Sequence, residues 1–263
     1  MAVMEFANVS FRYPTSKEQV LKEVSFQVQK GEFIVLCGAS GSGKTTMLRC
    51  LNFLERPDTG VIRVNGETMW DAADPATQRE SEVRKKRLHF GLVFQNFNLF
   101  PQYTALENVM LAGELLAKEQ PDYKANKKAI HAQLEAQARD LLAQMGLSER
   151  AGHYPHQLSG GQQQRVAIAR ALASEAPVIL ADEPTGNLDE DTAQDITEIL
   201  KESAHKMNKC VVVVTHSGEL AKQADVVFRL KKGELQVLER VQDGAAQPQS
   251  RRNNAPRSER RAK

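Results

Sequence analysis

The stretch that decides the fold reads Gly38-Ala39-Ser40-Gly41-Ser42-Gly43-Lys44-Thr45-Thr46. An apolar run, residues 33–37, precedes it, and the helix-forming residues 47–51 follow. This order predicts a strand, a loop and a helix whose main-chain N–H groups curl around a phosphate, because glycine permits the curl and the helix start adds partial positive charge. Lys44 can then reach the β- and γ-phosphates, and the Thr45 hydroxyl can bind Mg²⁺. The spacing predicts a bound triphosphate, but many unrelated enzymes share the loop.

The length and composition predict a cytosolic protein with a sizeable core. The chain has 263 residues, and no run approaches the roughly 18 apolar residues of a membrane span. Residues 1–5 lack the basic start and apolar centre of an export signal. The three cysteines, Cys37, Cys50 and Cys210, lie in apolar stretches and match no metal-ligand spacing, so we expect buried structural thiols.

The formal net charge of +2 is unevenly distributed. From residue 242 onward, six basic residues face two acidic ones, so this tail carries +4 and the remaining body −2. A near-neutral body argues against a nucleic-acid-binding surface. We therefore expect an ordered unit over residues 1–241 and a basic, disordered tail over 242–263. The tail either has no fixed role, lies on an anionic membrane surface or binds a partner.

Hydrophobic patterning predicts an α/β protein with some antiparallel structure. Alternating residues near the N-terminus favour half-buried strands, Asn65-Gly66 indicates a hairpin, and residues 71–87 resemble a solvated loop or helix end. Residues 104–145 are helical with a break at 120–122. Further predicted elements are a buried strand at 90–94, buried parallel strands at 178–181 and 211–214, helices at 160–174 and 190–206, and a closing hairpin over 226–238.

Two acidic residues supply what the phosphate loop lacks. Asp182 and Glu183 end a buried apolar run. A carboxylate at such a strand end can hold Mg²⁺ directly or through water, and the next can orient or deprotonate an attacking water. We predict Asp182 as the metal residue and Glu183 as the base.

A second candidate anion site is Leu158-Ser159-Gly160-Gly161-Gln162, which opens an amphipathic helix. The free N–H groups of a helix start, a serine hydroxyl and the lack of side-chain bulk suit a phosphate. Both helix starts could serve one nucleotide in one molecule, or the second could complete the site of a partner subunit. The sequence leaves both arrangements open.

Together, residues 158–162 and the phosphate loop resemble the signature pair of ATP-binding cassette ATPases, the motor subunits of ABC transporters, over about residues 3–238. The resemblance implies a P-loop NTPase core with a mostly parallel sheet, an N-terminal antiparallel β subdomain, and a helical signature subdomain over about residues 96–175. It implies an ATP hydrolase in which two subunits, two copies or a copy and a homologue, enclose two ATP molecules. Transmembrane permease subunits would hold this dimer at the inner face of the cell membrane.

The resemblance also implies residue roles. Tyr13 corresponds to the adenine-stacking aromatic, Gln95 to the glutamine that couples the metal site to the permease, and His216 to the γ-phosphate histidine. Asp189 falls in the interface loop 187–189. The remaining expected roles are ATP binding by Gly38 to Thr46, metal binding by Thr45, Gln95 and Asp182, catalysis by Lys44, Gln95, Glu183 and His216, and action on a second subunit by Ser159, Gly160, Gly161 and Gln162.

The sequence features that indicate the type of transporter point in two directions. Residues 183–189 resemble ATPases of the lipoprotein-release, macrolide-exporter and antimicrobial-peptide-resistance group, whereas residues 94–101 look equally like polar amino-acid importers. Importers more often have Ser-Ala in place of Gly186-Asn187, which favours the first group. A regulatory cassette without transport is the alternative of another class, but it would be expected to lose Glu183 or His216. Val109-Met110-Leu111 lies where this family docks a membrane subunit, and ordinary core packing is the alternative there.

Overall fold

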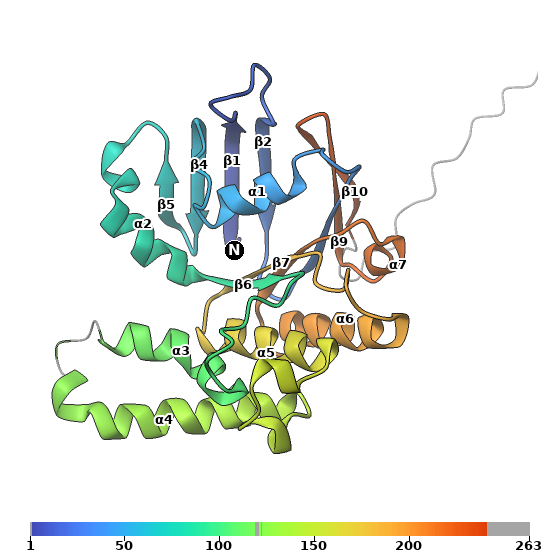
Figure 1. Cartoon of the computed structure of the whole chain (residues 1–263). Coiled ribbons are helices and arrows are strands. Elements are labelled where there is room, and N and C mark those ends of the chain that lie inside the picture. Colours follow the sequence, from blue (N-terminus) through green and yellow to red (C-terminus); the bar gives the residue numbers. More distant parts are fainter. Residues whose placement is uncertain (1, 119–120, 122, 241–263) are drawn as a thin grey trace, which may run out of the picture.

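An antiparallel sheet and a mostly parallel sheet form the framework of the computed structural model, which describes residues 2–118, 121 and 123–240 (Figure 1). The antiparallel sheet has the strand order β2-β1-β4-β5. One face of β2 is buried and the other is exposed, as its alternating sequence predicts. Asn65 and Gly66 form the predicted turn between β4 and β5, both with positive φ. The strands are β1 (Met4–Phe11), β2 (Leu21–Val28), β4 (Thr59–Val64) and β5 (Glu67–Asp71).

The second sheet has the order β10-β9-β3-β8-β7-β6. Its strands run parallel except β10, which pairs antiparallel with β9. All five residues of β8 are buried, as in a sheet covered on both faces. The strands are β3 (Phe33–Cys37), β6 (Phe90–Phe94), β7 (Val178–Asp182), β8 (Cys210–Val214), β9 (Val226–Lys231) and β10 (Glu234–Arg240).

Helices cover the two faces of this second sheet separately (Figure 1). Ile34 and Leu36 of β3 pack in a core shared with α1 (Lys44–Leu51) and the antiparallel sheet. Phe33 and Val35 pack in another core with α5 (Gly160–Ala173) and α6 (Glu190–His205). Beyond α5 lie α3 (Ala105–Lys118) and α4 (Tyr123–Gln144), separated near the predicted break. The sheet therefore stands between the phosphate-loop helix α1 and the signature helix α5.

Residues 71–87 are more ordered than their charge predicts. They contain a 3₁₀ turn and a short helix, α2 (Glu80–Lys86), whose Val83 is fully buried. Val83 packs in the core and holds this charged segment there, whereas the number of charges alone predicts an exposed segment. The remaining short elements are 3₁₀ turns at Pro75–Gln78, Arg87–His89, Ser148–Arg150 and Pro155–Gln157, and α7 (Gly218–Ala221).

The predicted burial holds for Cys50 and Cys210, which are fully buried, but not for Cys37, which is half-buried because it ends β3 beside the phosphate loop. Burial raises the pKa of both the Cys50 and the Cys210 thiol. Among the described helices, none combines the length and apolarity that crossing a bilayer requires. The predicted tail, 242–263, lies outside the described residues.

Candidate functional site

The phosphate loop joins β3 to α1 and uses glycine where no other residue fits. Gly38 has φ +154°, and a Cβ there would lie 2.5 Å from the main-chain oxygen of Leu230. Gly43, which caps α1, has φ +101°. Lys44 is nearly buried, and its Nζ donates to the carbonyl oxygens of Gly38 (2.9 Å) and Ala39 (3.1 Å). The ammonium group thus lies across the loop, where a phosphate's negative charge would attract it.

Thr45 and Asp182 meet as predicted for a metal pair. The Thr45 hydroxyl, in the first turn of α1, donates to Asp182 Oδ1 at the end of β7 (3.2 Å). Burial raises the pKa of Asp182, while the Thr45 hydroxyl opposes that shift. A carboxylate that is costly to bury beside a hydroxyl oxygen fits a hard divalent cation such as Mg²⁺, which favours oxygen ligands. Among the described residues, no group of three or more acidic, histidine or cysteine side chains is arranged to hold a metal ion by itself.

Glu183 is held by two neighbours from the end of β8. Its main chain has φ +46°, and its N–H donates to the Val214 carbonyl (2.9 Å). The Thr215 hydroxyl donates to Glu183 Oε2 (3.1 Å), and His216 Nδ1 lies 3.0 Å from Glu183 Oε1. The His216 side chain is 76% exposed, against 19% for Glu183. The predicted base and the predicted γ-phosphate histidine therefore contact each other, with the histidine on the open side.

Gln95 follows β6, next to the strand that ends at Asp182, and its partner is Asn187. Gln95 Nε2 donates to Asn187 Oδ1 (3.0 Å), and Asn187 Nδ2 donates to the Gln95 carbonyl (3.1 Å) and to Asn96 Oδ1 (3.0 Å). The structure thus joins the glutamine to the loop that carries Asp189.

Tyr13 contacts the same helix start as the phosphate loop. Its hydroxyl lies 3.1 Å from the Thr46 hydroxyl, and its ring packs edge-on against Phe11 (4.8 Å between centroids). These contacts fix the ring near the loop, where its face can stack on a base.

The structure does not bring residues 159–162 to the phosphate loop of the same chain. Ser159 caps α5: its hydroxyl oxygen accepts from the Gln162 N–H (3.3 Å), and Gln162 Oε1 accepts from the Ser159 N–H (3.0 Å). The serine hydroxyl keeps its own proton to donate. Because α5 and α1 cover opposite faces of the sheet, this helix start is separated from Lys44.

The start of α5 is packed tightly on the loop that leads into α6. Asp189 caps α6, accepting from the N–H (3.0 Å) and hydroxyl (2.8 Å) of Thr192, and the hydrogen bonds from Thr192, that from its main chain first, lower the Asp189 pKa. A Cβ on Gly161 would lie 2.4 Å from Thr192 Cγ2. Gln164, fully buried in α5, donates to the Pro184 carbonyl (2.7 Å). The candidate signature and the Asp189 loop thus form one packed unit, which we call the α5–loop unit (residues 159–164 with 184–192).

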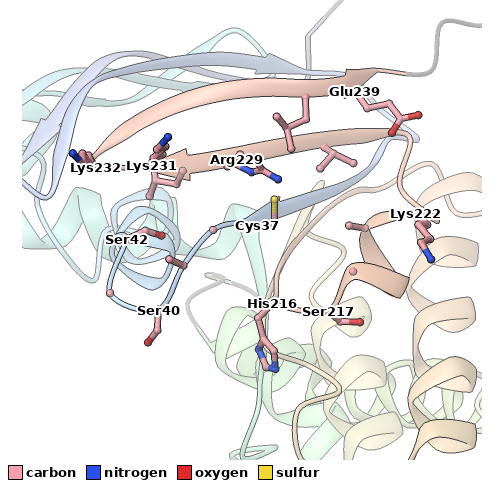
Figure 2. Close-up of a pocket in the computed structure, with 18 residues that line it drawn as sticks. Cys37, Ser40, Ser42, His216, Ser217, Lys222, Arg229, Lys231, Lys232 and Glu239 are labelled. Atoms are coloured by element: carbon pink, nitrogen blue, oxygen red, sulfur yellow. The ribbon is translucent and has the colours of Figure 1, made fainter.

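A cavity of about 870 Å³ opens on the His216 side of the phosphate loop (Figure 2). Ser40 and Ser42 line it from the loop, and His216 and Ser217 from the segment after β8. Its walls also carry the cations Lys222, Arg229, Lys231 and Lys232, and Glu239. Tyr13, Asp182 and Glu183 are not in its lining. The predicted adenine platform and carboxylates therefore lie beside this cavity and not within it.

Three contacts at the site are not predicted by the sequence patterns. Thr215 holds Glu183, Asn187 holds Gln95, and Gln164 holds the chain after Glu183. Thr215 directly precedes His216, so the strand end offered a signal for it. Asn187 was assigned only to the interface loop, and Gln164 was one polar residue on a predicted helix, because neither pattern indicates a partner far along the chain.

Comparison with known proteins gives consistent matches. A sequence family described as "ABC transporter" matches residues 21–186. An uncharacterized ABC transporter ATP-binding protein of Thermotoga maritima is 42% identical over 90% of this chain and 95% of its own length. The L-cystine transport system ATP-binding protein TcyN of Escherichia coli K12 is 40% identical over 94% and 91%.

Two further matches concern export and assembly. The macrolide export ATP-binding/permease protein MacB of Salmonella typhimurium is 39% identical over 89% of this chain, but over 34% of its own length. The solved dimeric cassette MJ0796, in a post-hydrolysis state bound to ADP and Pi, has a TM-score of 0.74 and 36% identity. That match covers 91% of this chain and 99% of the solved one.

Proposed function

This chain belongs to the ABC transporter family of ATP-hydrolysing cassettes, and we propose that it is the subunit that binds and hydrolyses ATP to drive separate transmembrane permease subunits. The observation that carries the proposal is the meeting of two pairs beside the phosphate loop. Thr45 bonds Asp182, and Glu183 bonds His216, at adjacent strand ends. A metal pair and a base pair side by side suit the attack of water on a γ-phosphate.

Each residue has a distinct task in this proposal. Lys44 exchanges its two loop carbonyls for phosphate oxygens, and Tyr13 stacks on the adenine. Thr45, Asp182 and Gln95 would hold Mg²⁺, which when bound neutralises charge on the phosphates. Glu183 accepts a proton from the attacking water, and His216 contacts the γ-phosphate from the open side of the site.

We place the missing half of the site on a second subunit, either another copy or a homologous ATPase. The start of α5 carries the hydroxyl of its capping residue, Ser159, and the N–H groups of a helix start, yet the sheet separates it from the phosphate loop of the same chain. In a head-to-tail pair, residues 159–162 of each chain would close over the ATP of the other. The solved relative, a dimeric cassette, supports this arrangement.

The test is Glu183→Gln, which keeps the shape and the oxygen that accepts from Thr215 but cannot act as a base. We expect turnover to fall by at least about a hundredfold, while ATP binding persists and the ATP-bound dimer accumulates on size-exclusion chromatography. Glu149→Gln, at an exposed glutamate in a 3₁₀ turn, is the matched control. The proposal fails if Glu183→Gln neither slows turnover nor increases the dimer.

For the type of transport, we propose the lipoprotein, macrolide or peptide export group. The support is the Gly186-Asn187 pair, which resembles that group, since amino-acid importers more often have Ser-Ala at these positions. The relatives include both the cystine transport and the macrolide export protein at similar identity. Purifying the membrane subunit that accompanies this chain, and counting its spans and external domains, tests the proposal. An amino-acid permease would overturn it in favour of import.

The permease contact is proposed at an apolar groove of about 370 Å³ beside the edge strand β6. Its lining includes Leu92, Phe94, Phe100 and Ala112, and Phe100 is 43% exposed. Such a groove suits an amphipathic cytoplasmic helix. Val109 and Met110, for which the sequence allows either docking or core packing, are buried in the core and serve packing.

Phe100→Asp tests this contact. We expect reduced co-purification of the permease with unchanged ATP hydrolysis by the isolated chain, because Phe100 lies outside the catalytic residues. Leu115→Asp is the control, since Leu115 is also exposed and apolar but does not line the groove. Equal losses from both variants would contradict a specific role for the groove. Binding to the permease would place the chain at the inner face of the membrane.

A further inference from the structure

We propose that Asn187 is a positioning residue that fixes which end of the Gln95 carboxamide faces the metal. The inference rests on the proposed function, in which Gln95 is one of the Mg²⁺ ligands. Only the oxygen of a carboxamide can bind Mg²⁺, so a glutamine ligand must present Oε1 and turn Nε2 away.

The orientation follows from one acceptor whose identity is certain. The main-chain carbonyl of Gln95 can only accept, so the end of Asn187 that faces it, at 3.1 Å, must be Nδ2. The other end, Oδ1, then faces the Gln95 side chain, and its partner at 3.0 Å must be the donor Nε2. Gln95 Oε1 is the end that remains for the metal.

A third hydrogen bond strengthens the orientation of Asn187 itself. Its Nδ2 also donates to Asn96 Oδ1 at 3.0 Å. Both protons of this amide are therefore used, and reversing it would put an oxygen against the Gln95 carbonyl. Because Asn187 is held in this orientation, its Oδ1 is fixed as the acceptor for Gln95 Nε2, and a reversed Gln95 amide would place Oε1 against that oxygen.

The residue before Asn187 makes room for the contact. A Cβ on Gly186 would lie 2.9 Å from Gln95 Nε2 and 3.3 Å from Gln95 Cδ. Any larger residue at 186 would displace the Gln95 amide from Asn187. Gly186 therefore leaves space for the Gln95 side chain, and Asn187 supplies the hydrogen bond that holds it.

The loop that carries Gln95 is anchored at its far end as well. Arg170 of α5 donates to the carbonyl oxygens of Asn98 (2.7 Å) and Phe97 (3.2 Å). Because Arg170 holds the backbone of this loop, the motion left to Gln95 is rotation of its side-chain amide. Asn187 restricts that rotation. The Arg170 side chain thus ties the Gln95 loop to α5, the helix whose start belongs to the α5–loop unit.

The experiment measures metal affinity directly and not turnover. Mn²⁺ is titrated by electron paramagnetic resonance into the full chain with a non-hydrolysable ATP analogue. For Asn187→Ala we expect the Mn²⁺ dissociation constant to rise about fivefold, the factor given by one net hydrogen bond. Binding of the analogue without divalent metal should stay unchanged, and this also shows that the variant is folded.

A second background separates orientation from general damage. In Gln95→Glu both ends of the side chain are oxygens, so no orientation is needed. In this background Asn187 Oδ1 faces a carboxylate oxygen and makes no hydrogen bond to it, so we expect Asn187→Ala to leave Mn²⁺ binding unchanged or tighter and not to weaken it. An equal effect in both backgrounds overturns the inference.

Gln95→Ala distinguishes failure of the inference from failure of the function it rests on. If Gln95→Ala weakens Mn²⁺ binding and Asn187→Ala does not, the inference alone is overturned. If Gln95→Ala has no effect, the metal role of Gln95 is overturned and the inference with it. Glu183→Gln still tests ATP hydrolysis independently.

Discussion

Gly161→Ala should destabilise the chain through a single methyl group. A Cβ on Gly161 would lie 2.4 Å from Thr192 Cγ2, while Thr192 Cβ and Oγ1 stay at 3.7 and 3.8 Å. Thr192 cannot simply rotate, because its hydroxyl and N–H both bond Asp189. Something in the α5–loop unit must shift.

The expected magnitude combines two opposing effects. Overpacking costs about 1–3 kcal/mol, whereas alanine in a helix gains up to about 1 kcal/mol over glycine. Gly161→Ala should therefore lower the free energy of unfolding by about 1 kcal/mol. Thr192→Ser deletes the colliding methyl and keeps the hydroxyl that bonds Asp189. In that background, Gly161→Ala should become neutral or stabilising by up to about 1 kcal/mol.

Urea unfolding of the two single variants, the double variant and the parent gives the coupling energy without reference to catalysis. We expect a coupling of about 1–2 kcal/mol, the difference between the effects of Gly161→Ala in the two backgrounds. A coupling below about 0.5 kcal/mol, the scatter of independent sites, would refute the close approach of Gly161 to Thr192. The connection between the candidate signature and the Asp189 loop would then rest on the hydrogen bond from Gln164 to the Pro184 carbonyl and not on the Gly161 contact.

Three further predictions concern other parts of the chain. Tyr13→Phe keeps the ring and should leave ATP affinity within about threefold, whereas Tyr13→Leu should weaken it by 1–3 kcal/mol, about 5- to 150-fold, in equilibrium binding. Alkylation of the native protein should label Cys37 and spare Cys50 and Cys210, whose buried thiols have raised pKa values. Mass spectrometry measures which thiols are labelled, and rapid labelling of all three would contradict this prediction. Gln164→Glu puts a buried carboxylate against the carbonyl that Gln164 now bonds and should cost about 3 kcal/mol at pH 7 in urea unfolding. Because burial raises the folded-state pKa of the new acid, that cost should shrink as the pH falls through this pKa, and a pH-independent cost would refute the reasoning.

Local patterns predicted the elements well where sequence neighbours decide the outcome. Asn65-Gly66 sets its own turn, and the glycines of the phosphate loop set the chain path before Lys44. The short apolar run that ends at Asp182, with the β-branched Val178 and Ile179, favours the buried strand that it forms. In each case, the side chains that determine the structure are adjacent in sequence.

Contacts between distant segments could not be predicted in this way. Gln95 and Asn187 are 92 positions apart, and nothing in either tripeptide around them indicates an amide pair. Gln164 in α5 reaches the Pro184 carbonyl only because the chain returns through β7. Sequence spacing also left open whether residues 159–162 serve their own phosphate loop, since only the packing of the sheet shows which face each helix covers.

The sheet that separates α1 from α5 has a genetic consequence for a site formed between two chains. If two copies of this chain form the proposed head-to-tail pair, a variant with a defective phosphate loop and a variant with a defective signature should each be inactive alone. In a mixed dimer, one site combines both defects, while the other combines the intact loop of one chain with the intact signature of the other. Two null alleles of this kind should complement each other, and two alleles within the same half should not.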